Sequence, residues 1–411
     1  MTPVALDHRR LYRLPWTLPD NGISWLEPTS ACNIVCVGCY RENLPSSHKP
    51  LEVVREEIDT FQRLRKSDCI SIAGGEPLLH PQIVEIVREI AARGFKPIIN
   101  TNGVALTPEL LRELKKAGVR GFTFHIDSKQ FRAKWRGKNE VELNELRLHY
   151  AQMLAEVGGL SCAFNATVYE DNLPYVPDIL EWAARHIDIV HVVVFIAYRQ
   201  IVPRLAETFD FYAGGQRVDL KPLPYVADGE QNVGIRSTDI LAVIRQRFPD
   251  FMPCAYLNGT ERPDSFKWLL TVRVGARGGK VLGYVGPKFM EFVQTQHHLW
   301  RDRYLAYAHP RLLRFGRSGC LLLSPLDRGA REVVARYLAW TLRNPLRLFR
   351  PLHFQSIMII QPVDILEDGR QDMCDGCPDV TVWKGNLVWS CRLEEPKQYG
   401  TFVRTVPKCM L

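Results

Sequence analysis

The sequence lacks the features of a membrane-spanning or disulfide-bonded protein. Its 411 residues include no run of eighteen apolar residues, about the length that a transmembrane helix needs. The first ten residues hold no apolar stretch long enough for a signal peptide. The 11 cysteines are odd in number and clustered in spacing, which does not suit a disulfide framework. We therefore expect a cytoplasmic chain in a reducing compartment, peripheral to the inner membrane face at most.

What is present is typical of a globular α/β protein. Apolar residues make up 46% of the chain and charged residues 24%. Strand-like apolar runs alternate with helical patterns, among them 52–66, 81–93, 107–118 and 174–186. Alternation of this kind predicts parallel strands joined by helical crossovers. Six such units predict a (βα)6 partial TIM barrel over residues 22–200.

The remaining domain boundaries follow changes in this pattern. Residues 1–21 are predicted to be an N-terminal extension, and 201–250 an insertion or linker with one helix. Residues 199–233 hold three prolines and three glycines, which suits a linker. Residues 251–411 are predicted to be a C-terminal extension of mixed helix and hairpin, with hairpins at 267–284 and 381–390.

Three cysteines near the start of the chain, Cys32, Cys36 and Cys39, follow one another at spacings of four and three residues. A cubane cluster has four irons, so three thiolates leave one iron open to a small molecule. A structural zinc ion is the alternative, but it needs a fourth ligand. Only His48 stands within ten residues of the triplet as a further His or Cys. The triplet therefore favours an iron–sulfur cluster.

Polar and glycine residues end three of the predicted strands. The first ends in the element Gly74-Gly75-Glu76-Pro77, where two glycines permit close approach of a ligand and Glu76 supplies charge for an ammonium group. The next strands end at Asn102 and Ser128. Because the carboxyl ends of parallel strands share one edge of a barrel, these residues are predicted to line one site.

In this combination, the cysteine triplet and the Gly-Gly-Glu-Pro element resemble the radical S-adenosylmethionine (radical SAM) superfamily. The resemblance covers roughly residues 22–200. It implies a [4Fe–4S] cluster on the triplet, with Tyr40 beside the cluster and the adenine. It also implies that residues 74–77 bind the amino group of S-adenosylmethionine (AdoMet), and that Asn102 and Ser128 contact its ribose and carboxylate. A flavodoxin or ferredoxin-type donor would supply the electron that cleaves AdoMet to a 5′-deoxyadenosyl radical.

A second cysteine group lies near the C-terminus, at Cys374, Cys377 and Cys391. Cysteines two residues apart around a glycine are typical of an iron–sulfur or zinc knuckle. Cys391 follows the predicted hairpin and can return as a third ligand, and the fourth is expected to be Cys254 or Cys409. The arrangement resembles the auxiliary clusters that many radical SAM enzymes carry in a C-terminal extension. A structural zinc knuckle remains the alternative.

Residues 301–350 contain no lysine, yet they hold eleven arginines against three acids. Apolar residues, including Trp340, Leu342 and Phe349, are interleaved with these arginines. Such a segment suits an anionic membrane surface, which would receive the barrel mouth. Nucleic acid is a less favoured partner, and ordinary packing on the barrel is the simplest alternative.

We therefore predict a radical SAM enzyme that abstracts hydrogen from a hydrophobic substrate, a lipid or isoprenoid. The alternatives are a peptide-modifying maturase with an auxiliary cluster and a non-enzymatic metal-knuckle protein that binds nucleic acid. The specific substrate, the reaction and the number of auxiliary clusters do not follow from these residues.

Overall fold

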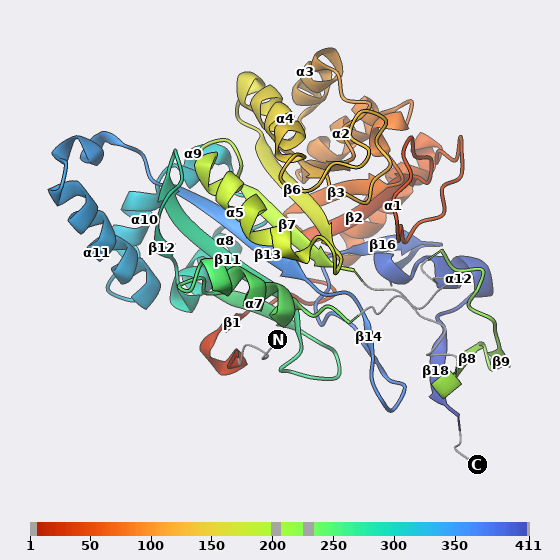
Figure 1. The fold of residues 1–411 in the computed structure, drawn as a ribbon. Helices are drawn as coiled ribbons and strands as arrows, with labels where there is room; N and C mark the ends of the chain where they lie inside the picture. Colours follow the sequence, from red (N-terminus) through yellow and green to blue (C-terminus); the bar gives the residue numbers. More distant parts are fainter. Residues whose placement is uncertain (1–5, 199–206, 225–233, 409–411) are drawn as a thin grey trace.

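The fold is organised around one eleven-stranded sheet (Figure 1), in a computed structural model that describes residues 6–198, 207–224 and 234–408. The strand order is β1-β10-β11-β13-β7-β6-β5-β4-β3-β2, with β12 beside β11. Strands β2 to β7 lie parallel to one another. They are β2 (Ile23–Thr29), β3 (Cys69–Gly74), β4 (Lys96–Thr101), β5 (Gly121–His125), β6 (Ser161–Val168) and β7 (Val192–Ala197). The predicted α/β class with a mostly parallel sheet is confirmed.

A helix follows each of the first five of these strands. The helices are α1 (Leu51–Leu64), α2 (Ile83–Ala92), α3 (Pro108–Ala117), α4 (Asn144–Val157) and α5 (Val176–Arg185). Val54, Ile58 and Phe61 form the inner stripe of α1 and are wholly buried. Helix α3 begins and ends as its sequence predicts, because Thr107 accepts a hydrogen bond from the Leu110 amide and Gly118 adopts φ +109°.

Beyond β7 the sheet continues into residues that the sequence assigns to the C-terminal extension. Strand β13 (His353–Ile360) pairs in parallel with β7, and β11 (Phe266–Ala276) pairs antiparallel with β13. The sheet is completed by β10 (Ala255–Asn258), β12 (Lys280–Tyr284) and β1 (Tyr12–Arg13). The hairpin β11–β12 is the predicted one, whereas β13 is not predicted, because its partner β7 lies more than 150 residues away in the chain.

Smaller elements lie beside this sheet. Helix α7 (Ser237–Arg247) and the hairpin of β16 (Val380–Trp383) and β17 (Asn386–Trp389) confirm two predictions. The predicted linker contributes β8 (Phe209–Ala213) and β9 (Gln216–Arg217) to a separate sheet with β18 (Arg404–Pro407). Two short strands, β14 (Asp364–Ile365) and β15 (Gln371–Asp372), pair with each other, and helix α12 (Glu394–Tyr399) comes after β17 in the chain.

The arginine-rich segment is helical, and it does not lie at the barrel mouth, where the sequence predicts it to lie. Its elements follow α8 (Pro287–Arg301) and are α9 (Pro310–Leu313), α10 (Gly316–Leu323), α11 (Arg328–Leu342) and the 3₁₀ turn η4 (Pro345–Phe349). The Lys96 ammonium donates to the Ala306 carbonyl, and the Ala306 amide donates to Asp68. These contacts are at the amino ends of β3 and β4, opposite the strand ends where a parallel-barrel site forms.

Across the described residues, no helix has both the length and the apolarity to cross a bilayer.

Candidate active site

The loop that carries Cys32, Cys36 and Cys39 leaves the carboxyl end of β2 and is held against the end of β3. The Gly75 amide donates to the Thr29 carbonyl at 2.9 Å, and the Glu76 amide donates to the Ala31 carbonyl at 2.7 Å. A Cβ at Gly75 would lie 2.2 Å from the Ala31 oxygen, so only glycine permits this approach. The Gly-Gly-Glu-Pro element therefore fixes where the cysteine loop begins.

Further contacts fix the loop around each cysteine. The Asn43 side chain accepts from the Cys32 amide at 2.9 Å and donates to the Cys32 carbonyl at 3.2 Å. The Tyr169 hydroxyl donates to the Val37 carbonyl at 2.7 Å. Between Cys36 and Cys39, Gly38 adopts φ +66°, and a Cβ there would lie 2.0 Å from the Tyr198 ring. No sequence pattern points to Asn43, Tyr169 or Tyr198, because each contacts backbone of the cysteine loop that lies far from it in the chain.

Glu76 does not face the cavity into which the cysteines open. Its wholly buried carboxylate accepts hydrogen bonds from the Thr101 hydroxyl at 2.6 Å and from the amides of Asn102 and Leu78, at 2.7 and 3.0 Å. Burial raises the pKa of Glu76 despite these donors. Pro77 is also buried and begins the 3₁₀ turn Pro77–Leu79. Both residues thus support the strand ends.

Three other predicted residues do line the cavity, namely Gly74, Gly75 and Asn102. The Asn102 side chain donates to the Asn33 side chain at 2.7 Å and lies 3.8 Å from the Cys32 sulfur. Tyr40 also lines the cavity, and the Arg41 guanidinium lies over its ring at 4.5 Å. Ser128 is not among the lining residues, and its amide donates to Glu140 at 2.8 Å.

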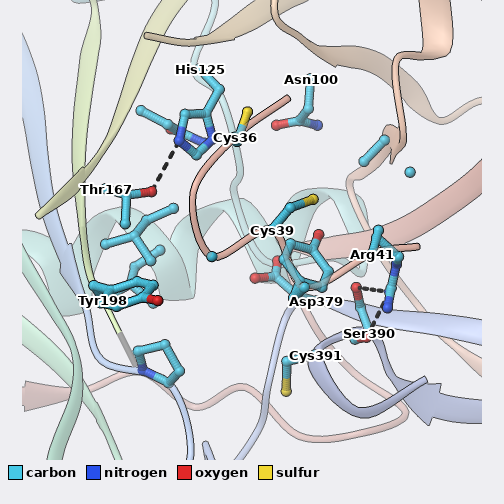
Figure 2. Close-up of a pocket in the computed structure, with 18 of the residues that line it drawn as sticks. Cys36, Cys39, Arg41, Asn100, His125, Thr167, Tyr198, Asp379, Ser390 and Cys391 are labelled. Atoms are coloured by element: carbon cyan, nitrogen blue, oxygen red, sulfur yellow. Dashed lines mark hydrogen bonds between the residues drawn. The ribbon is translucent and has the colours of Figure 1, made fainter. Parts of the chain in front are cut away.

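Polar residues of β5 and β6 line the cavity where Ser128 does not. The His125 Nε2 atom lies 2.9 Å from Asp127 and 3.1 Å from the Thr167 hydroxyl (Figure 2). Burial opposes ionisation of Asp127, but hydrogen bonds from His125 and from the Lys129 amide hold the pKa of its carboxyl below its usual range. The sequence carries a signal for these residues, because polar side chains alternate with buried ones. That pattern places Thr123, His125 and Asp127 on one face, opposite Phe122, Phe124 and Ile126.

On the β6–β7 side of the cavity, two buried polar atoms of lining residues have no hydrogen-bond partner among the described residues, as is also true of the Trp25 Nε1 and Arg41 Nε atoms elsewhere in the lining. The two on this side are the Asn165 Oδ1 atom, on β6, and the Tyr198 hydroxyl, which follows β7. A buried polar group without a partner is costly, and a bound ligand can satisfy it. These atoms therefore leave hydrogen-bonding capacity unused in the wall between β6 and β7.

The C-terminal cysteine segment is held against the start of the sheet. The Arg65 guanidinium, which is 2% exposed, donates to the carbonyls of Ile23 and Cys377 at 2.9 and 2.8 Å. The Asn21 side chain donates to the Gly376 carbonyl at 3.0 Å. A Cβ at Gly376, whose φ is +72°, would lie 2.0 Å from the Trp16 oxygen. Glycine at this position therefore allows Cys374 and Cys377 to approach the core.

One cavity of about 660 Å³ joins the two cysteine groups. All six cysteines line it, namely Cys32, Cys36, Cys39, Cys374, Cys377 and Cys391. In Figure 2, Cys36 and Cys39 lie on one side and Cys391 on the other, with Asp379 and Ser390 between them. Cysteine spacing in the sequence predicts each group separately, and only the fold brings the two together.

Of the two predicted fourth ligands, the structure describes only Cys254, and it places this residue away from the cavity. Cys254 is wholly buried, its thiol donates to the Leu270 carbonyl at 3.3 Å, and it is not among the cavity-lining residues. Burial raises the pKa of Cys254 to about 12, as expected for a thiol inside an apolar core. Cys409 lies outside the described residues.

A buried ion-pair network connects the two cysteine segments directly. Arg41 follows Cys39 by two residues and forms an ion pair with Glu27 of β2. The same guanidinium donates to the Ser390 carbonyl at 2.6 Å and to its hydroxyl at 2.9 Å (Figure 2). The Ser390 hydroxyl in turn donates to Glu27 at 2.7 Å. Because Ser390 precedes Cys391, this network sets where that cysteine stands relative to Cys39.

The donor groups present suit iron–sulfur clusters. Burial, nearby Asp127 and the other thiols raise the pKa of Cys36, and burial with the Cys377 thiol raises the pKa of Cys391 to about 12. A cationic cluster would relieve both penalties by binding thiolates. Among the described residues, no three Cys, His, Asp or Glu side chains are grouped closely enough to hold a single metal ion. The fit therefore rests on two sets of three thiols at one cavity.

Asp379 lies in the cavity wall between the two sets. Burial raises the pKa of its carboxyl to about 7, although the nearby Arg65 opposes this shift. A carboxyl in this condition can accept or donate a hydrogen bond to a ligand.

Comparison with known proteins gives a family match within the first half of the chain. Residues 26–183 match the Radical SAM superfamily. An AdoMet-dependent heme synthase of Oleidesulfovibrio alaskensis is 28% identical over 185 residues, 42% of this chain and 46% of that protein. A tungsten-containing aldehyde ferredoxin oxidoreductase cofactor-modifying protein of Pyrococcus furiosus is 34% identical over 106 residues, 25% of this chain and 30% of the relative. The matched region thus spans less than half of each relative.

Among solved structures, Streptococcus suis SuiB bound to precursor peptide SuiA is similar at 13% identity and a TM-score of 0.40, over 56% of this chain and 46% of that one. A likeness at this level carries no argument about function.

Over residues 26–183 the chain is thus similar to the radical SAM superfamily. Members of this superfamily are enzymes that use a [4Fe–4S] cluster and AdoMet.

Proposed function

We propose that the chain abstracts hydrogen from a hydrophobic substrate held between two iron–sulfur clusters. The first would be bound by Cys32, Cys36 and Cys39, and an auxiliary cluster by Cys374, Cys377 and Cys391. One observation carries this proposal: all six cysteines line the same cavity. When bound, the first cluster and AdoMet supply a 5′-deoxyadenosyl radical, and the chain's own residues position the two molecules that react.

The AdoMet side of the cavity is assigned to the strand ends nearest the first cysteine group. We assign Gly74, Gly75 and Asn102 to contact AdoMet, because they line the cavity and Asn102 lies 3.8 Å from the Cys32 sulfur. Glu76 would position Asn102, because its carboxylate accepts a hydrogen bond from the Asn102 backbone amide and does not line the cavity. Tyr40 stands beside this group and would pack against the cluster and the adenine.

The substrate side is assigned to the wall built by the late strands. This wall is mostly apolar, although it also carries Asp364 and Gln371, and its apolar members include Trp268, Ile360, Val363, Ile365 and Met373. Apolar walls with a few polar groups are typical of sites that bind hydrophobic small molecules. Relatives named for heme synthesis and for cofactor modification agree with a substrate of cofactor size.

The structure removes the reason for which the sequence favours a lipid or isoprenoid substrate. A membrane-facing cavity mouth would require the arginine-rich segment beside it, but this segment contacts Asp68 and Lys96 at the amino ends of the strands.

Anaerobic reconstitution with iron and sulfide, followed by reduction, tests the proposal. The wild type should cleave AdoMet to 5′-deoxyadenosine, and the rate should rise with a lipophilic cell extract more than with an aqueous one. Replacing the first three cysteines by alanine should abolish cleavage. Replacing the second three should leave basal cleavage and remove the response to extract. Cys320→Ala, at a buried core thiol, is the matched control.

Cleavage by the variant that lacks the first three cysteines would refute the assignment of the first cluster. An unchanged response in the variant that lacks the second three would refute the role of the auxiliary cluster. A response to the aqueous extract alone would refute the hydrophobic substrate.

A further inference from the structure

The chain exposes a dense group of apolar side chains at the end of α11 and in η4. We define the tip as residues 342–350, where Leu342, Leu346 and Phe349 are 83%, 73% and 84% exposed. Leu338 is 51% exposed and lies four residues before Leu342, so both share one helix face. Phe315, 58% exposed, adjoins the tip through its pairing with Leu352. Single exposed apolar residues are common, whereas a group of this kind marks a binding surface.

The same tip is strongly basic. It contains Arg343, Arg347 and Arg350 and no acidic residue. Among the described residues, Arg343 and Arg350 form no salt bridge, and both are exposed. Arg347 stacks on Trp340 at 5.0 Å and donates to its carbonyl, which stiffens the tip. Arg317 donates to the Leu348 carbonyl at 2.8 Å and ties the tip to α10.

We propose that the tip is a docking surface for an anionic phospholipid membrane. Leucine and phenylalanine side chains would enter the boundary between headgroups and acyl chains, while the arginines remain among the phosphates. Charge complementarity selects this occupant, because each arginine near an anionic surface adds attraction. The proposal is independent of the reaction at the cavity.

Two other occupants fit the tip less well. In a two-fold dimer the same surface meets its own copy, which would bring Arg343 and Arg350 close to the partner's identical charges. Nucleic acid would use the arginines, but it offers no apolar layer for Leu342, Leu346 and Phe349.

The position of the tip defines an orientation on the membrane. Helices α10 and α11 project at one end of the molecule, and α12 with the β8–β9–β18 sheet lies at the other (Figure 1). The tip leads into the start of β13 at His353, whereas Ile360, at the end of β13, lines the cavity. A membrane-bound molecule would therefore hold its cavity away from the lipid surface, open to an electron donor.

Co-sedimentation of the reconstituted full chain with vesicles tests this inference. The wild type should bind vesicles of equal parts phosphatidylcholine and phosphatidylglycerol, and rising salt should weaken binding without abolishing it. Arg343→Gln with Arg350→Gln should weaken binding at low salt about 25-fold, because each arginine contributes about 1 kcal/mol. Leu346→Ser with Phe349→Ser should remove the association that survives high salt.

Matched controls keep the test specific to the tip. Arg112 and Arg277 are exposed arginines elsewhere, with side chains 62% and 81% exposed, and changing both to glutamine should have little effect. Leu18→Ser with Met252→Ser is the apolar control, at 51% and 50% exposure. AdoMet cleavage should be retained by every variant, which shows that each one folds.

The inference would be overturned if the wild type bound pure phosphatidylcholine vesicles equally well, or if both tip variants bound anionic vesicles as tightly as the wild type. It would also fail if the chain bound no vesicles and the tip substitutions abolished its self-association instead. Displacement from vesicles by an oligonucleotide, but not by inorganic phosphate at the same ionic strength, would assign the tip to nucleic acid.

Discussion

The buried pair of Arg41 and Glu27 allows a quantitative test of how the two cysteine segments are joined. The side chains of Arg41 and Glu27 are 2% and 6% exposed, so neither charge is solvated by water. Arg41→Met leaves the Glu27 carboxylate buried with the Ser390 hydroxyl as its remaining hydrogen-bond donor. Removing one member of a buried ion pair costs about 3–5 kcal/mol. We expect a loss of this size in the free energy of unfolding.

Removing both charges should cost less than removing one. In Arg41→Met with Glu27→Leu, no buried charge is left without a partner, so the double variant should be more stable than Arg41→Met. Urea unfolding of the wild type, Arg41→Met, Glu27→Leu and the double variant gives the coupling energy between the two sites. Arg41→Lys is the conservative control, because it keeps the charge but cannot reach Glu27 and both Ser390 oxygens in the same geometry. If the two single effects simply add, the network is not coupled and our reasoning is refuted.

The same pair predicts that the stability of the wild type and that of Arg41→Met change in opposite directions as the pH falls. Burial would raise the pKa of Glu27, but Arg41 and the hydrogen bonds outweigh burial and hold this pKa below the usual range of a glutamate. The wild type should therefore lose this stabilisation as the pH falls below about 4.5. In Arg41→Met, burial dominates and the pKa rises, so stability should increase as the pH falls through that raised value. Equal slopes in the acid range would contradict this account.

Three further predictions concern other parts of the chain. Gly38→Ala should lower the free energy of unfolding by about 1–2 kcal/mol because of its φ of +66°, and the clash with Tyr198 should add to this loss. The substitution should lower iron loading of the first cluster more than it lowers thermal stability. Burial lowers the pKa of His191 from 6.5 to about 4, so unfolding free energy should fall by about 3 kcal/mol between pH 6.5 and 4. His191→Asn should flatten this slope, because asparagine does not titrate. Its side-chain oxygen can still accept a hydrogen bond from the Cys162 amide, which in the wild type donates to the His191 ring at 2.9 Å. A variant without the first three cysteines should retain about 4 irons per chain, and zinc in place of iron would assign the second group to a structural knuckle.

Much of the fold and of the first site follows from local sequence pattern. The alternation of apolar strands and amphipathic helices predicts β2 to β7 and α1 to α5, because each element is specified by its own periodicity. The spacing of the cysteine triplet and the two glycines of the 74–77 element are similarly local. The structure adds the reason for these glycines, which is the contact of Gly75 with Ala31.

The tertiary structure alone decides what these local features do together. Strand β13 joins β7 across more than 150 residues, and this pairing carries Ile360 and the C-terminal cysteines to the cavity. No local pattern encodes such a pairing, since it depends on the closure of a long stretch of chain. The same holds for Arg41, which is an ordinary charged residue in the sequence and becomes a buried link only when Glu27 and Ser390 meet it. The chain's sequence thus determines which groups are available, and burial and non-local pairing determine which of them share one site.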